Sequence, residues 1–203
     1  MKYQIIFIIS ALVITQLPGC ASTQYESSKH NGVQTENALA ELNQWEVTAK
    51  LGLKSAIKAQ LINLNWQQQA ENYQIKLYGL AGLGATRISG NNYQSIIKQG
   101  TNTFTDTPEQ LGLQFFGVPL PVGALSWWIK GLPSPNHTVA KDITMQHNGL
   151  INSFEQQGWD IRYLEYAATG PYFLPKKISG RRGELSFKLV ITRWHIKNNK
   201  IVP

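Results

Sequence analysis

The sequence of 203 residues has little that could support metal, redox or hydrolytic chemistry. It contains one cysteine, Cys20, so it has neither a disulfide framework nor a thiolate cluster for zinc. Its four histidines lack metal-ligand spacing, and no Gly-x-Ser-x-Gly nucleophile motif occurs. The 12 acidic residues are scattered, and no spacing selects a carboxylate pair for glycoside hydrolysis. These absences argue against an enzyme, and we expect no metal and no cofactor.

Charge is also sparse, because only 15% of the residues are charged and the formal net charge is +7. Basic residues cluster only at Lys176-Lys177 and Arg181-Arg182. This scatter argues against nucleic acid as a partner. An acidic protein or anionic lipid headgroups would suit the positive sign better.

The chain lacks an apolar run of the roughly 20 residues that a membrane-spanning helix needs. A shorter run, residues 5–13, follows Lys2 and precedes Leu17-Pro18-Gly19-Cys20, which is the layout of an export signal over residues 1–19. The last four of these residues resemble the bacterial lipobox, in which the cysteine thiol receives diacylglycerol, the peptide is cut before it and the new amine is acylated. Cleavage would lower the net charge to +6, and three acyl chains on Cys20 would make a lasting membrane anchor.

The remainder divides into a tether and one domain. Residues 20–36 are polar and lack an apolar period, so they are expected to form a flexible tether. Residues 37–203 show no internal repeat and are long enough to bury a core as a single domain.

Hydrophobic periodicity predicts a mainly β domain with short helices. Apolar and polar residues alternate in many short segments separated by turn residues, which is typical of a sandwich or barrel of about ten strands. Thr107-Pro108 followed by Gln110 is typical of the start of a helix. The predicted strands are 47–53, 61–66, 73–79, 86–89, 93–98, 101–105, 151–156, 159–167, 173–179 and 185–196, and the predicted helices are 37–43, 107–116 and 121–130.

Two apolar features remain. The six tryptophans are spread over many elements, and they form either a plain aromatic core or part of a concave apolar cleft. The connection around Leu80 and Leu83 contains three glycines and no charge. It is either a buried bulge or an exposed tip suited to touching acyl chains or a membrane.

The order and spacing of these residues resemble the LolB family, the outer-membrane lipoprotein receptors of Gram-negative bacteria. The resemblance covers most of the mature chain. It rests on Leu17-Pro18-Gly19-Cys20, a strand ending in Trp66, Gly82-Leu83-Gly84, Leu120-Pro121-Val122 with Leu125, Trp128 and Gly131-Leu132-Pro133, Gly158-Trp159-Asp160-Ile161-Arg162-Tyr163 with Tyr166, Leu174-Pro175 with Ile178, and a last strand reaching Trp194.

The resemblance implies an unclosed antiparallel β-barrel, capped by helices, with a hydrophobic cavity for lipoprotein acyl chains. It also implies a monomer anchored at the outer membrane and facing the periplasm. Such a receptor takes lipoproteins from a soluble periplasmic carrier, LolA, and inserts them into the outer membrane. A leucine on a protruding loop serves insertion in this family; Leu83 aligns best, with Leu80 as the other possibility. Ala21, which is not Asp, is consistent with the outer membrane.

Candidate cavity residues are the apolar side chains that the expected strands and helices would turn inward. They are Leu64, Trp66, Ile75, Leu77, Phe115, Leu125, Trp128, Ile161 and Tyr163. Two other functions stay open from the residues alone. One is a structural or assembly lipoprotein of the envelope without acyl-chain transfer, and the other is a lipid-modified hydrolase.

Overall fold

The computed structural model describes residues 32–56, 58–80, 84–117 and 119–197, and these form one sheet with three helices. The strands are β1 (Gln44–Lys54), β2 (Ala59–Gln69), β3 (Asn72–Leu80), β4 (Gly84–Gly90), β5 (Ser95–Gln99), β6 (Asn102–Asp106), β7 (Lys141–Met145), β8 (Ile151–Gln156), β9 (Trp159–Thr169), β10 (Tyr172–Arg182) and β11 (Leu185–Ile196). The helices are α1 (Gly32–Glu41), α2 (Pro108–Phe116) and α3 (Val122–Trp128).

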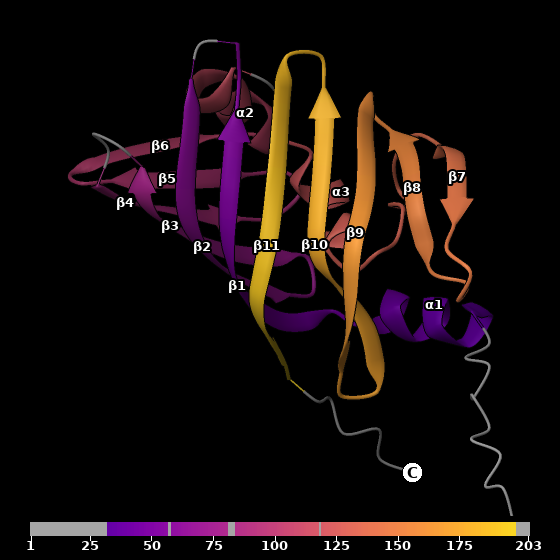
Figure 1. Ribbon diagram of the computed structural model, residues 1–203. Coiled ribbons are helices and arrows are strands. Elements are labelled where there is room, and N and C mark those ends of the chain that lie inside the picture. The colour runs from indigo at the N-terminus through magenta and orange to yellow at the C-terminus, as the bar shows by residue number, and fades with distance from the viewer. Residues whose placement is uncertain (1–31, 57, 81–83, 118, 198–203) are drawn as a thin grey trace, which may run out of the picture.

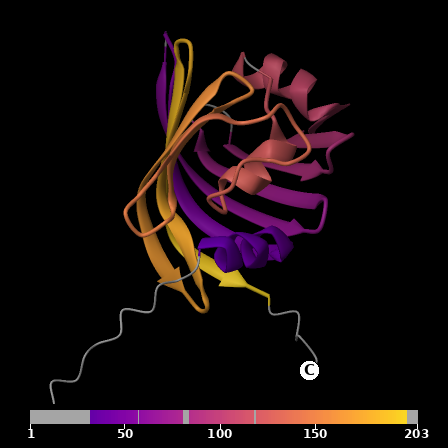
Figure 2. The same cartoon turned by 90° about the vertical axis from the view of Figure 1, so that its right-hand side faces the viewer.

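The sheet is antiparallel and does not close. Its strand order is β6-β5-β4-β3-β2-β1-β11-β10-β9-β8-β7, so the first and last strands meet in the middle and β6 and β7 form the two edges. The sheet bends strongly, and α2 and α3 lie over its concave side, whereas α1 lies across one end (Figures 1 and 2). This arrangement confirms the predicted fold class of an unclosed antiparallel half-barrel capped by helices.

The core lies on the concave side because alternate residues of the long strands point there. Val47, Ile62 and Ile161 are fully buried, and Trp45 packs between Trp66 and Trp194 with ring centroids 5.2 and 5.5 Å away. Aromatic side chains therefore fill the end of the half-barrel at which α1 lies.

The helices predicted in the middle of the chain are confirmed. The Thr107 hydroxyl accepts a hydrogen bond from the Gln110 N–H at 3.3 Å, Pro108 occupies the first turn, and Gly117 ends α2 with a φ of 75°. A left-handed residue at this position lets the backbone N–H cap the helix, and glycine adopts that conformation without strain.

Two elements, α1 and β7, differ most from what the sequence predicts. Helix α1 spans Gly32–Glu41 instead of residues 37–43, so the tether boundary predicted before residue 37 falls inside this helix. Strand β7 is absent from the predicted strands, because no apolar alternation marks it and all five of its residues are exposed. It is an edge strand, and Asp142 interrupts it with a φ of 51°.

Some expectations fall on other parts of the chain. The signal peptide, Cys20 and Leu83 lie outside the described residues. Within the ranges that are described, no helix combines the length and apolar character required to cross a bilayer.

Candidate functional site

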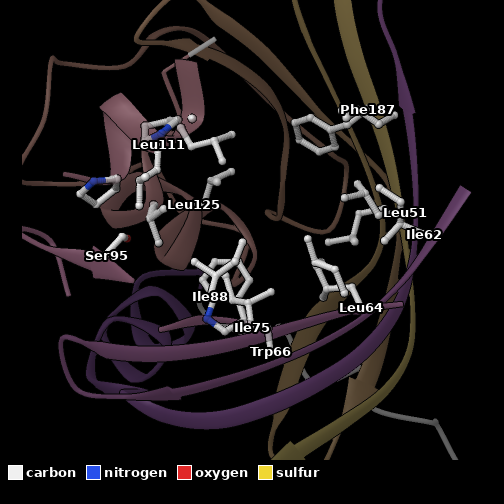
Figure 3. A pocket seen from close by; sticks show the side chains of 18 of the residues that line it. Leu51, Ile62, Leu64, Trp66, Ile75, Ile88, Ser95, Leu111, Leu125 and Phe187 are labelled. Atoms are coloured by element: carbon white, nitrogen blue, oxygen red, sulfur yellow. The ribbon is translucent and has the colours of Figure 1, made fainter. Parts of the chain in front are cut away.

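An apolar cavity of about 160 Å³ lies between the concave face of the sheet and the two helices that cover it (Figure 3). Side chains from β1 to β5, β9 and β11 form one wall, and residues of α2, α3 and the segment joining them form the other. The lining residues are Leu51, Leu53, Ile62, Leu64, Trp66, Ile75, Leu77, Ile88, Ser95, Ile97, Pro108, Leu111, Gly112, Leu120, Pro121, Val122, Leu125, Trp159, Leu185, Phe187 and Leu189.

The strand register explains why the sheet wall is continuous. Leu64 pairs with Leu77 and Trp66 pairs with Ile75 across β2 and β3, and paired residues of an antiparallel sheet point to the same face. Ile75 in turn pairs with Ile88 of β4. Alternation of apolar and polar residues along each strand therefore becomes a band of apolar side chains across several strands.

The helices supply the opposite wall. Leu111 of α2 is buried and Leu125 of α3 is half-buried, and both face the sheet wall in Figure 3. Phe115 of α2 packs edge-on against Phe104 of β6 at 5.1 Å, which holds α2 to the edge of the sheet. The space between helices and sheet is thus bounded by hydrocarbon on both sides.

Polar groups near the cavity are few and mostly paired. Ser95 hydrogen-bonds the Tyr73 hydroxyl, and burial raises the pKa of Tyr73. The Trp66 indole N–H donates to Gln68 Oε1 at 2.9 Å. No cluster of three potential metal ligands occurs among the residues that the structure describes. Such a cavity suits hydrocarbon.

The other half of the concave side contains a buried hydrogen-bond network centred on Gln156. The buried Gln156 Oε1 accepts from the Trp128 indole N–H at 2.7 Å and from the Ser134 N–H at 2.9 Å. Its amide group donates to the carbonyls of Ser134 and Thr138 at 2.9 and 2.7 Å. The Tyr163 hydroxyl donates to the Trp128 carbonyl at 2.7 Å, and burial raises the pKa of Tyr163 far above its usual value. This network fixes the end of α3 to β8 and β9.

The structure places the predicted cavity residues in two groups. Leu64, Trp66, Ile75, Leu77 and Leu125 line the cavity. The other four predicted residues do not line it. Phe115 packs on Phe104 of β6. Trp128, Ile161 and Tyr163 are buried elsewhere in the core, where the Tyr163 hydroxyl is bonded to the Trp128 carbonyl.

Several lining residues are absent from the set of cavity residues that the sequence predicts. Leu51, Leu53, Phe187 and Leu189 belong to the same alternating series that predicted β1 and β11, so the alternation already carried the signal. For the insertion loop, the structure shows Leu80 at the end of β3, where its backbone pairs with Gly84.

A second, more polar pocket of about 260 Å³ lies at the end near α1. Lys130 is 4% exposed there, and its ammonium donates to the Leu42 carbonyl at 3.1 Å and lies 4.2 Å above the Trp127 ring. Burial lowers the pKa of Lys130 to about 8. The group caps the carbonyl end of α1, which has no basic residue in its own last turn.

Comparison with known proteins decides the family. The family model for outer membrane lipoprotein LolB matches residues 43–194. The chain belongs to the LolB family. An outer-membrane lipoprotein LolB from Pseudomonas savastanoi pv. phaseolicola is 31% identical over 203 residues and covers 96% of both chains. The LolB of Pseudomonas paraeruginosa is 32% identical, with 96% of this chain and 97% of the relative covered.

Solved structures agree with the fold. A LolA superfamily protein from Nitrosomonas europaea superimposes with a TM-score of 0.56 at 8% identity, covering 82% of this chain and 91% of the other. LolB family membership makes the chain an outer-membrane lipoprotein that acts in lipoprotein localisation.

Proposed function

We propose that the chain accepts lipoproteins by binding their acyl chains in the apolar cavity, and then inserts them into the outer membrane. The observation that carries this proposal is the cavity between the sheet and the helices α2 and α3, whose lining is almost entirely hydrocarbon. The LolB family membership supports the same role.

The size of the cavity indicates that binding requires movement. Another protein's apolar cavity of about 150 Å³ binds one benzene molecule, so a cavity of about 160 Å³ has room for a hydrocarbon group of roughly that size. An acyl chain of about 15 methylenes needs several times that space. The sheet is held by continuous hydrogen bonding, so the added volume must come from displacement of the helices that form the other wall.

The energetics require a direct transfer between proteins. Each methylene exposed to water costs about 0.8 kcal/mol, so a triacylated lipoprotein does not cross the periplasm unescorted. We infer that its escort is a soluble LolA-like carrier of related fold. An affinity difference of about 1.4 kcal/mol would favour the receptor tenfold. Acyl chains on Cys20 would keep the receptor at the membrane that receives the cargo.

Binding is tested with a fluorescent fatty-acid probe and a matched pair of variants. Leu125→Glu places a carboxylate in the cavity wall, whereas Leu113→Glu changes a leucine of α2 that is 45% exposed and does not line the cavity. We expect Leu125→Glu to weaken probe binding at least tenfold and Leu113→Glu to leave it unchanged. A wild-type chain that fails to bind the probe would instead favour the structural or assembly role.

Insertion is tested separately at the β3–β4 connection. We expect Leu83→Glu to accept lipoprotein from the carrier normally but to impair its delivery to vesicles, because a charge at a membrane-touching tip opposes entry into hydrocarbon. Leu80→Glu is the parallel variant for the alternative assignment. Normal delivery by both variants would remove this loop from the mechanism.

A further inference from the structure

Two buried polar side-chain atoms have no hydrogen-bond partner within the described residues, namely Trp159 Nε1 and Gln60 Oε1. A buried donor or acceptor without a partner is costly and uncommon in folded proteins, so each such atom requires an explanation. One atom is a donor and the other is an acceptor. Together they match a ligand that carries a carbonyl group and an N–H group.

Both atoms lie near one end of the apolar cavity. Trp159 lines the cavity and packs against Phe187, with ring centroids 5.6 Å apart. Phe187 and Leu53 line the cavity and also an open groove of about 510 Å³, and Gln60 lines that groove. Leu53 pairs with Phe187 on one side and with Gln60 on the other. The unpaired donor therefore belongs to a residue of the cavity wall, and the unpaired acceptor belongs to a residue on the same face of the sheet as Leu53 and Phe187.

The groove is more polar than the cavity. Lys54 and Lys188 line it, and both are exposed. The two ion pairs found in the described parts of the chain use Glu165 with other lysines, so neither of these cations is neutralised by a carboxylate there. Lys54 and Lys188 each follow a cavity residue by one position, so their side chains lie on the opposite face of the sheet. The polar end of an acylated molecule in the cavity would therefore meet Trp159 and Gln60 and not these lysines.

We propose that this end of the cavity is the subsite for the polar linkage of the bound acyl group. The Trp159 indole N–H donates to the carbonyl oxygen of an ester or amide linkage, and Gln60 Oε1 accepts the N–H of an amide linkage. A diacylglyceryl cysteine with an acylated amine carries both kinds of linkage. This inference rests on the proposed acyl-chain binding, and it adds the direction in which the ligand lies, with its chain ends away from Trp159 and Gln60.

Trp66 is a natural contrast within the same cavity. It also lines the wall, but its indole N–H is already bonded to Gln68. Removing the nitrogen of Trp66 therefore leaves a protein acceptor unpaired, whereas removing the nitrogen of Trp159 leaves none. The two tryptophans separate ligand recognition from structural hydrogen bonding.

The test measures how well three probes of equal chain length displace the fluorescent fatty acid from the full chain: an alkane, a methyl ester and an N-methyl amide. We expect the wild type to prefer the ester over the alkane by about tenfold, as one additional buried hydrogen bond would give. Trp159→Phe keeps an aromatic ring against Phe187 and should abolish that preference, which is read as the ratio of the ester and alkane affinities within the same variant. Trp66→Phe should retain the preference.

Gln60→Met tests the acceptor, and we expect it to lower the preference for the amide over the ester without changing the preference for the ester over the alkane. Equal binding of ester and alkane by the wild type would overturn the subsite while leaving acyl-chain binding intact. Retention of the ester preference by Trp159→Phe would also overturn it. Failure of all three probes to bind would instead contradict the proposed function, so the two failures are distinguishable.

Discussion

Gln156 provides the sharpest test of how the cavity wall is held. Its side chain makes four hydrogen bonds, with the Trp128 indole, the N–H and carbonyl of Ser134, and the Thr138 carbonyl. Gln156→Leu preserves most of the side-chain volume but leaves those four groups without their partner. At about 1 kcal/mol for each stranded group, we expect a loss of roughly 4 kcal/mol in the free energy of unfolding. Such a loss is a large share of a typical domain's total of about 5–15 kcal/mol.

Urea unfolding followed by tryptophan fluorescence measures the change. With a slope of about 2 kcal/mol per molar urea, the midpoint should fall by about 2 M. Gln74→Leu is the control, because Gln74 is exposed on β3, and its effect should stay within about 0.5 kcal/mol. A loss below about 1 kcal/mol in Gln156→Leu would show that these four bonds do not fix the end of α3.

Three further predictions follow from other sites. The pKa of Lys130 is about 8 in the folded chain and about 10.4 in the unfolded chain, so the unfolded state binds more protons between these pH values. The free energy of unfolding should therefore rise as the pH increases from about 8 to 9.5. Lys130→Met should remove that rise. Gly180→Ala should lower the free energy of unfolding in urea by about 2 kcal/mol, because a Cβ at this position would lie 2.2 Å from Phe187 Cε1. Gly52→Ala is the control, since the nearest atom to its added Cβ would be 3.8 Å away, and its effect should be nearly neutral. Hydrogen exchange should become faster in α2 when a fatty acid binds and should stay slow around Ser134; an unchanged α2 would contradict opening on that side.

Hydrophobic periodicity predicted most of the sheet, because a long strand with one buried face has apolar and polar residues in alternation. β2 and β9 alternate buried and exposed residues over much of their length, and both were predicted close to their observed positions. β7 shows no such alternation, because all five residues of this edge strand are exposed. The helix predicted over residues 37–43 contains Leu39 and Leu42, and both are buried. The first turn of α1 has one apolar residue, Val33, so the sequence marks its start poorly.

Hydrophobic periodicity predicted which face of the sheet each site residue points to. It did not predict whether that residue borders the cavity or is enclosed by other side chains. Leu64 and Ile161 both point to the concave side, yet Leu64 borders the cavity and Ile161 is fully enclosed. The difference depends on where the segment after α3 crosses the sheet, and that path is set by Gln156 and the backbone of Ser134 and Thr138. Contacts between residues more than 15 positions apart leave no local pattern in the sequence.

The same asymmetry constrains how the cavity enlarges. The C-terminal end of α3 is tied to β8 and β9 through Trp128, whose indole N–H and carbonyl are both bonded. Among the described residues, one ring contact joins α2 to the sheet, that of Phe115 with Phe104. It is an apolar contact without the fixed geometry of a hydrogen bond, so an acyl chain could replace it. A hydrocarbon chain pressing outward from the cavity meets less resistance at α2 than at the end of α3. The helical cover should therefore swing away from the β5–β6 edge, with the Trp128 end as its pivot, and lengthen the cavity away from the groove beside Gln60.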